Sequence, residues 1–171
     1  MREQPPFFYE TEVEWKEERK GELRSPDLPP LAVATPPEFQ GHEGFWTPEH
    51  LYVASVNVCF MTTFLAIAQN SKLEVASFCA SAKGKLEKVE GTGFQITEII
   101  LRPSVLVRSS QDLDRAGRIL EKAEKNCLIY NSIKSAVKVE PEVFCEQVPA
   151  SPCPPVLGPI TLNESWDYNG D

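Results

Sequence analysis

The longest apolar segment of this sequence, residues 51–68, limits the chain to folds that can surround a long helix. Its hydrogen-bonding side chains are few and scattered, so apolar residues surround the helix axis instead of forming one stripe: Tyr52, Ser55, Asn57, Thr62 and Thr63. A start signal precedes the segment, because Thr47 can cap the first turn, Pro48 suits the first helical position and Glu49 places negative charge beside unpaired amides. The pattern predicts a helix over residues 47–68 that is buried on all sides.

This helix nearly has the length of a membrane span, since a spanning helix needs about 20 apolar residues. The scattered polar groups, the absence of a second span and the mean hydropathy of -0.27 argue against a membrane as partner. A chain of 171 residues has little material to wrap such a helix, so a second copy of the subunit is expected to complete the core.

Charge and cysteine usage exclude further classes. The net charge is -8 without a clustered basic block, which excludes nucleic acid as the expected partner. Residues 1–8 lack the apolar core of a secretory signal, so a cytoplasmic location is expected. An odd number of cysteines cannot pair completely, and a reducing compartment favours transient, catalytic disulfides over structural ones: Cys59, Cys79, Cys127, Cys145 and Cys153.

The residues before the helix favour a small antiparallel sheet. Apolar and charged residues alternate over residues 7–16, which is typical of a half-buried strand. A charged turn follows at residues 17–21, a return strand is expected at residues 22–25 and a third short strand at residues 31–34. The Pro and Gly residues between residues 35 and 46 indicate a connecting loop.

The residues after the helix complete an α+β fold. Alternating apolar residues at 73–87 and 93–108 predict a long β-hairpin. An amphipathic helix is expected from residue 111 to about residue 127, and a final strand at residues 136–139. The composition then changes to proline-rich, so we expect a folded domain of residues 1–140 and an extended C-terminal tail, residues 141–171, draped over the fold or over a partner subunit.

Metal and cofactor chemistry is not expected from this sequence. His42 and His50 are not spaced to share a helix face, and no Cys-x-x-Cys pair or glycine-rich phosphate loop occurs. A cysteine protease with Cys59 and a histidine is formally possible, but a polypeptide would hardly reach a thiol inside so apolar a helix. Taken alone, Cys59 fits a packing role, because free cysteine is among the most frequently buried residues.

A second cysteine, Cys127, at the end of the second helix changes this interpretation. Together the two regions resemble the OsmC/Ohr family of thiol peroxidases over roughly residues 10–140. The resemblance is carried by Pro48-Glu49-His50-Leu51, Asn57-Val58-Cys59-Phe60, Ala123-Glu124-Lys125-Asn126-Cys127 and Asn131-Ser132. The chain departs from the commonest family pattern at Leu128 and Tyr130, where many members have proline and serine, and at Asn57-Val58, where small alanines are common. Cys79, Cys145 and Cys153 have no role in the resemblance.

The resemblance implies a function and a set of site residues. It implies an intertwined homodimer in which Cys59 is the peroxidatic cysteine, Cys127 resolves it as a disulfide, and Glu49 and an arginine assist. The best match for the arginine is Arg19, with Arg24 as the alternative. The expected substrates are organic hydroperoxides and, less well, hydrogen peroxide, with an external dithiol or thiol as reductant. Both the Ohr-like and the OsmC-like branch fit. The alternative is an OsmC-like protein that binds a small ligand or senses redox state without efficient turnover.

Two geometric expectations follow from the residues. Burial of Cys59 among apolar neighbours should raise its pKa, so a nearby cation is expected to hold the thiolate. Ten residues separate Glu49 from Cys59, which is about 15 Å along a straight helix. One arginine does not bridge that distance comfortably, so we expect each site to be built from both subunits of an antiparallel helix pair. If both cysteines only pack, their Cα atoms should lie beyond the roughly 7 Å that a disulfide tolerates.

Overall fold

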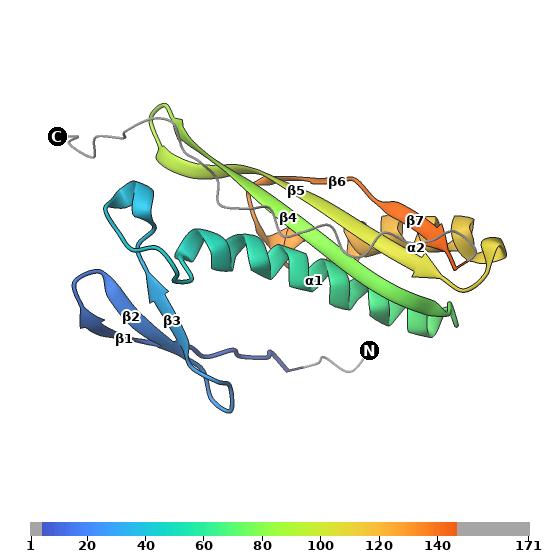
Figure 1. The fold of residues 1–171 in the computed structure, drawn as a ribbon, viewed down its shortest axis with the longest axis horizontal. Coiled ribbons are helices and arrows are strands. Elements are labelled where there is room, and N and C mark those ends of the chain that lie inside the picture. Colours follow the sequence, from blue (N-terminus) through green and yellow to red (C-terminus); the bar gives the residue numbers. More distant parts are fainter. Residues whose placement is uncertain (1–4, 147–171) are drawn as a thin grey trace. The chain divides into compact units, whose positions relative to one another are not determined.

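The computed structural model describes residues 5–146 of this chain and confirms the α+β class. Figure 1 shows its elements in chain order. The described part divides into two compact units at Leu51 and Tyr52. We call residues 5–51 the N-terminal unit and residues 52–146 the core unit, and we describe each by itself.

The N-terminal unit contains the predicted three-stranded antiparallel sheet, in the order β1 (Glu12–Glu17), β2 (Lys20–Arg24) and β3 (Leu31–Ala34). The turn between β1 and β2 is tight, because Glu17 pairs with Lys20 and Glu18 has a positive φ of 46°. Beyond β3, the backbone amide of Ala34 donates to the Trp46 carbonyl at 2.9 Å. The predicted connecting loop therefore returns to the edge of this sheet before the long helix begins.

The N-terminal unit has almost no core of its own. Ala34 and Thr47 are buried, whereas six large apolar side chains are each at least 64% exposed: Phe7, Phe8, Tyr9, Val13, Trp15 and Leu28. The prediction of a half-buried first strand is therefore wrong within one chain, since every residue of β1 is exposed. The alternation of apolar and charged residues is present, but within the N-terminal unit no described residue covers the apolar side of β1.

The long helix α1 (Pro48–Asn70) begins where the sequence predicts. The backbone amide of His50 donates to the Thr47 side-chain oxygen at 3.3 Å, which caps the first turn. Only one face of α1 is buried, at every fourth residue: Val56, Phe60, Phe64 and Ala68. The prediction of burial on all sides is wrong for a single chain, because Val58 is 54% and Leu65 39% exposed on the other side. By length and composition α1 is the one described helix that could cross a membrane, yet Phe60 and Phe64 lie in the protein core.

The core unit is a sheet with a long hairpin at its centre, formed by β4 (Val75–Val89) and β5 (Gly93–Val107). Two short strands, β6 (Ala136–Val139) and β7 (Glu142–Cys145), follow each other along β5 and run parallel to it. Parallel pairing requires a crossover connection, and α2 (Leu113–Asn126) provides it.

β7 lies past residue 140, where the sequence placed the start of the tail. Its residues add to the sheet, and Cys145 at its end is buried. The folded part of the chain therefore reaches at least to residue 145. The rest of the predicted tail, residues 147–171 with Cys153, lies outside the described residues.

Both helices pack on the same face of the sheet. The core contains alternate residues of β5, such as Ile99, Leu101 and Val105, together with the buried face of α1. α2 contributes the apolar face that its spacing predicted: Ala116, Ile119, Leu120 and Ala123. The result is a two-layer arrangement in which α1 runs beside the hairpin (Figure 1).

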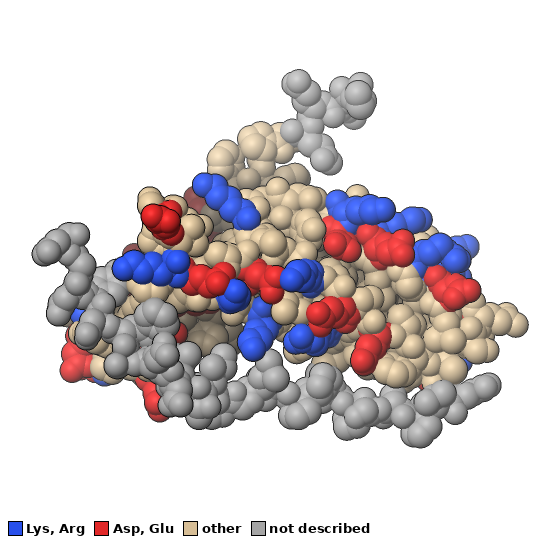
Figure 2. All heavy atoms as spheres, turned by 90° about the horizontal axis from the view of Figure 1, so that it is seen from above, with Lys and Arg blue, Asp and Glu red and all other residues tan. Residues whose placement is uncertain are grey.

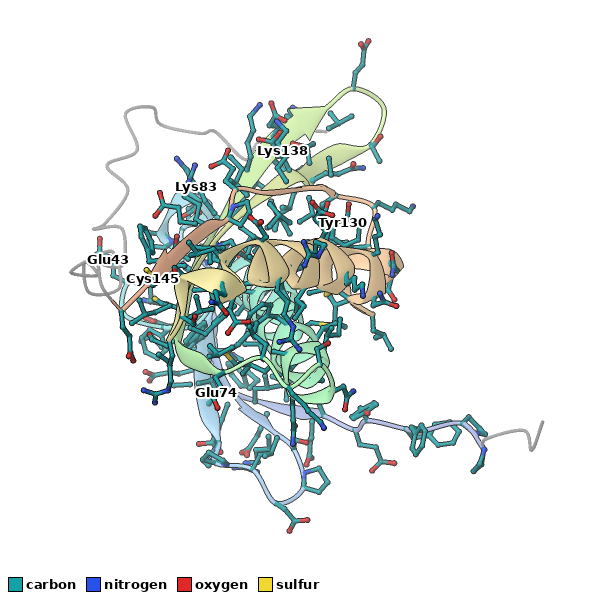
Figure 3. All side chains as sticks on the ribbon, turned by 90° about the vertical axis from the view of Figure 1, so that its right-hand side faces the viewer. Glu43, Glu74, Lys83, Tyr130, Lys138 and Cys145 are labelled. Carbon is teal, nitrogen blue, oxygen red and sulfur yellow. The ribbon has the colours of Figure 1, made fainter. Side chains whose placement is uncertain are left out.

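The opposite face of the sheet is polar. Arg102 pairs with Glu140 at 2.9 Å, and Lys138 pairs with Glu98. Basic and acidic side chains are intermixed on the face seen in Figure 2. Lys83 and Lys138, labelled in Figure 3, lie on this face. Lys83 of β4 and Lys138 of β6 pair with Ile100 of β5 from its two sides. Such exposed ion pairs contribute little stability each.

Gly84 sets how closely α1 approaches β4. A Cβ atom at this position would lie 2.5 Å from Cγ2 of Val53, a contact that the stiff β-branched side chain does not relieve easily. We expect Gly84→Ala to lower the free energy of unfolding by roughly 1–3 kcal/mol, measured by urea denaturation. Adding Val53→Ala should recover part of that loss in a double-mutant cycle.

Gly117→Ala is the matched control for this prediction, because no atom lies within 4 Å of a Cβ there. In helix α2 this change should leave the free energy of unfolding equal or slightly higher. Equal stabilities for Gly84→Ala and Gly117→Ala would contradict the close packing of α1 on β4.

Candidate active site

The structure brings Cys59 and Cys127 together from distant parts of the sequence. Cys59 lies in the middle of α1, and Cys127 directly follows the last residue of α2. At Cys127 the backbone becomes extended, with φ -67° and ψ 114°, and its side chain is fully buried. The two thiols lie close enough for a hydrogen-bond interaction that lowers the pKa of Cys59 and raises that of Cys127. This geometry argues against the packing alternative, which required the cysteines to lie far apart.

A short loop after α2 holds the second thiol against the first. The loop ends in a single 3-10 turn, η3 (Tyr130–Ser132). The Asn131 amide donates from its side chain to the carbonyl of Lys125 at 3.1 Å, and from its backbone to the carbonyl of Cys127 at 3.1 Å. The spacing of Lys125, Cys127 and Asn131 therefore has a physical reason. Asn131 binds the carbonyls of Lys125 and Cys127 and so ties the loop to the end of α2.

Hydrogen bonds make Cys59 a more acidic thiol than an ordinary cysteine. Burial raises its pKa, but this effect is outweighed by hydrogen bonds from the Cys127 thiol, the Ile129 amide, the Thr63 hydroxyl and the Leu128 amide. The amide of Ile129 lies 3.5 Å from the Cys59 sulfur. The pKa of Cys59 is therefore lowered overall, by neutral donors of its own unit. The expectation that only a cation could offset burial is corrected by this finding.

Cys127 is shifted in the opposite direction. Burial, its hydrogen bond to Cys59 and the negative charge of the Cys59 thiolate raise the pKa of Cys127 to about 11. At neutral pH Cys127 therefore stays protonated, so it can act as the donor in its hydrogen bond with Cys59. The pair is asymmetric, with one sulfur prepared as a nucleophile and the other held as a thiol.

Glu49 lies in the first turn of α1, within the N-terminal unit. Its Oε2 atom is buried and has no hydrogen-bond partner among the described residues. A buried carboxylate oxygen without a partner is costly, which points to a missing donor. α1 is continuous between Glu49 and Cys59, so the helical rise still separates them by about 15 Å.

The two candidate arginines differ in their partners. Arg24 pairs with Glu14 at 2.8 Å and with Glu22 on the surface of the small sheet. Arg19, in the turn between β1 and β2, donates to the carbonyl of Phe39 at 2.6 Å and pairs with no described carboxylate. The charge of Arg19 is therefore not neutralised by a described carboxylate, whereas that of Arg24 is.

Sequence reasoning missed Thr63, Leu128 and Ile129 as contributors to the site. A signal existed for Thr63, because it follows Cys59 by four residues and so lies on the same helix face. The two amides carry no sequence signal, since every residue except proline has one. Of the cysteines without an expected role, Cys79 lies on β4 and Cys145 on β7.

The chain thus has a two-layer α+β fold in which two thiols with oppositely shifted pKa values meet, one from α1 and one from the end of α2. The family model described as OsmC-like protein matches residues 41–142, which contain both cysteines and Glu49. The chain belongs to this family.

Solved structures have the same fold. An OsmC-like protein of unknown function from Vibrio cholerae superposes with a TM-score of 0.73 at 24% identity, covering 80% of this chain and 99% of that one. An organic hydroperoxide resistance protein from Legionella pneumophila gives a TM-score of 0.66 at 22% identity, with 82% and 99% covered. One from Elizabethkingia anophelis gives 0.67 at 19% identity, with 84% and 100% covered.

Among curated proteins, the chain is 26% identical over 114 residues to the uncharacterised protein YmaD of Bacillus subtilis. The match covers 65% of this chain and 75% of that protein.

Proposed function

We propose that this protein is a cysteine-based peroxidase that reduces organic hydroperoxides, and hydrogen peroxide less well, in oxidative stress defence in the cytoplasm. The observation that carries the proposal is the contact between an acidic thiol, Cys59, and a buried, protonated thiol, Cys127. Two proteins of the same fold are named for organic hydroperoxide resistance, which supports the choice of substrate class.

The proposed reaction proceeds in three steps. The Cys59 thiolate attacks one peroxide oxygen, so an S–O bond forms while the O–O bond breaks, and the leaving alkoxide takes up a proton to become an alcohol. The Cys127 thiol then loses its proton and attacks the Cys59 sulfenic sulfur, so the S–S bond forms while the S–O bond breaks, and the leaving hydroxide takes up the proton to become water. An external dithiol or thiol reduces the disulfide by exchange. No metal or cofactor takes part.

The first step also prepares the second. The negative charge of the Cys59 thiolate helps to raise the pKa of Cys127. Oxidation to the neutral sulfenic acid removes that charge, so Cys127 loses its proton more easily once there is a sulfenic acid to attack. The order of events is therefore set by the electrostatic coupling of the two sulfurs.

We further propose that the working form is a homodimer whose sites are shared between subunits. Among the described residues, Glu49 has a buried oxygen without a hydrogen-bond partner and Arg19 pairs with no carboxylate. α1 exposes Val58 and Leu65, seven residues apart on one face. A second copy packed antiparallel on α1 would cover this face and bring Glu49 of one chain towards Cys59 of the other.

The preference for organic peroxides follows from the apolar surroundings of Cys59. Leu128, whose amide donates to the Cys59 sulfur, is 68% exposed, and Val58 precedes Cys59 on α1. Alkyl groups gain from burial against such side chains, whereas hydrogen peroxide has no apolar part to bury.

The test is peroxide consumption by the purified protein with cumene hydroperoxide and dithiothreitol. Wild type should consume peroxide catalytically, Cys59→Ser should fall to the uncatalysed background, and hydrogen peroxide should be consumed more slowly. Cys145→Ser is the matched control, because Cys145 is also a buried free cysteine but lies on β7. Consumption by wild type no faster than by Cys59→Ser would refute the peroxidase.

The rival candidate is a redox sensor or small-ligand binder of the same fold. The acidic, hydrogen-bonded thiol pair fits sensing as well as turnover, and the exposed Leu128 and Val58 could contact an apolar ligand. A sensor would form the Cys59–Cys127 disulfide with one equivalent of peroxide but would not sustain consumption when dithiothreitol is in excess. The same assay therefore separates the two functions.

A further inference from the structure

The Cys59 sulfur receives donors from two directions within the core unit. From its own helix comes the hydroxyl of Thr63, which lies one turn further along α1. From the loop after α2 come the backbone amides of Leu128 and Ile129, the latter 3.5 Å from the sulfur. Ile129 is the N-cap residue of the turn η3. The first amides of a helical turn have no acceptor within the turn, so the amide of Ile129 can donate to the sulfur.

None of these three donors carries a charge. The titratable group that faces Cys59 from the α2 side is the Cys127 thiol. Tyr130, seen at the end of α2 in Figure 3, directs its amide to the Cys127 sulfur and not to Cys59. β4, which packs against the other side of α1, meets it with a carbonyl at Ala80 and with the bare backbone of Gly84.

We propose that Thr63 is a positioning residue which, with the amides of Leu128 and Ile129, forms a donor cradle that holds Cys59 as a thiolate within a single subunit. The cradle deepens the proposed peroxidase function, in which it prepares the nucleophile before any arginine approaches. It also assigns a role to Leu128, because a proline at this position would have no amide to donate.

The cradle has a physical reason to work. A hydrogen bond to a charged acceptor is about twice as strong as one between neutral groups, so each donor favours the thiolate over the thiol. The donors are already in place in the folded protein, and little reorganisation is needed when the thiol loses its proton. Together with the Cys127 thiol, a hydroxyl and two amides therefore favour the thiolate without the help of a cation.

The experiment is the pH dependence of Cys59 alkylation by iodoacetamide, followed at Cys59 by peptide mass spectrometry in the full chain. Alkylation requires the thiolate, so its rate rises as the pH passes the pKa of Cys59. Thr63→Val removes the hydroxyl at nearly constant shape and should shift this rise to higher pH, with alkylation at neutral pH slower by about three- to tenfold. The rate at the alkaline plateau should stay the same.

Thr63→Ser keeps the hydroxyl and should restore the wild-type profile. A profile of Thr63→Val that coincides with wild type, or a Thr63→Ser variant that behaves like Thr63→Val, would overturn the role of Thr63. A merely structural role of the threonine would change the plateau rate and would not shift the profile along the pH axis.

A second pair of variants tests the amide side and keeps the proposal falsifiable if Thr63→Val does not fold. Ile129 has φ -66°, which proline adopts without strain, so Ile129→Pro removes the donor and keeps this angle. Ile129→Ala keeps the amide and is its control. We expect Ile129→Pro to shift the profile to higher pH and Ile129→Ala to match wild type; identical profiles of the two variants would exclude the amide.

Failure of the cradle and failure of the peroxidase are distinguishable, because alkylation involves no peroxide. Shifted profiles together with no peroxide consumption would establish the cradle in a protein that is not a peroxidase. Unshifted profiles together with normal consumption would refute the cradle and leave Arg19 as the group that activates Cys59.

Discussion

Cys127→Ser should make Cys59 sensitive to irreversible oxidation. In wild type, Cys127 captures the Cys59 sulfenic acid as a disulfide before a second peroxide molecule reacts. Serine keeps a hydroxyl that can donate to the Cys59 thiolate, so the first oxidation should proceed normally, but it cannot form the disulfide. Excess cumene hydroperoxide should then carry Cys59 to the sulfinic acid, and the variant should be inactivated by roughly tenfold less peroxide than wild type.

Intact-protein mass spectrometry reads this outcome directly. Wild type treated with one equivalent of peroxide should lose two hydrogens and keep the mass of the disulfide, whereas Cys127→Ser should gain one oxygen and then two. Cys145→Ser, which removes another buried thiol, should follow wild type. A stable sulfenic acid in wild type, or equal resistance of Cys127→Ser and wild type, would mean that Cys127 does not resolve Cys59.

Val58→Glu combined with Leu65→Glu should convert the proposed dimer into monomers. Both side chains are exposed in the single chain and lie on one face of α1, where the proposed interface would bury them. Burying two unpaired carboxylates costs several kcal/mol, so the dissociation constant should rise more than about 100-fold. The measurement is sedimentation equilibrium, accompanied by the peroxide assay.

Activity should fall together with the dimer, because a monomer would keep its Glu49 away from any Cys59. Gln111→Glu is the control, because it adds the same kind of charge at an exposed position in the 3-10 turn η2 (Ser110–Asp112). This control should remain dimeric and active. A double variant that stays dimeric would place the interface elsewhere, and a fully active monomer would show that the site is not shared.

Much of the fold could be predicted because its signals are local. The cap at Thr47, the hairpin between residues 73 and 108 and the apolar face of α2 each depend on neighbouring residues, and the structure confirms them. β7 was missed because its four residues follow a proline in a proline-rich composition, and only pairing with β5 makes them a strand. Short edge strands of this kind carry too few residues for alternation to show.

The candidate site divides in the same way. Cys59 and Cys127 were found through their residue types and flanking motifs, and the structure places their thiols in contact. Their environment was not predictable, because the sequence indicated burial and therefore a raised pKa for Cys59. Four donors, the Cys127 thiol, the Thr63 hydroxyl and two backbone amides, reverse that direction, and any residue but proline could provide the amides.

The sequence by itself determined most of the elements, the family pattern and the two thiols, since these depend on residue types and short-range spacing. Only the tertiary structure decided three other properties: that α1 buries one face and leaves Val58 and Leu65 exposed, that one oxygen of Glu49 has no partner among the described residues, and that the pKa of Cys59 is lowered while that of Cys127 is raised. The physical reason is that exposure and pKa depend on what surrounds an atom in space. For Cys59 an important part of those surroundings is the loop after α2, which follows α1 in the sequence only after the whole β4–β5 hairpin.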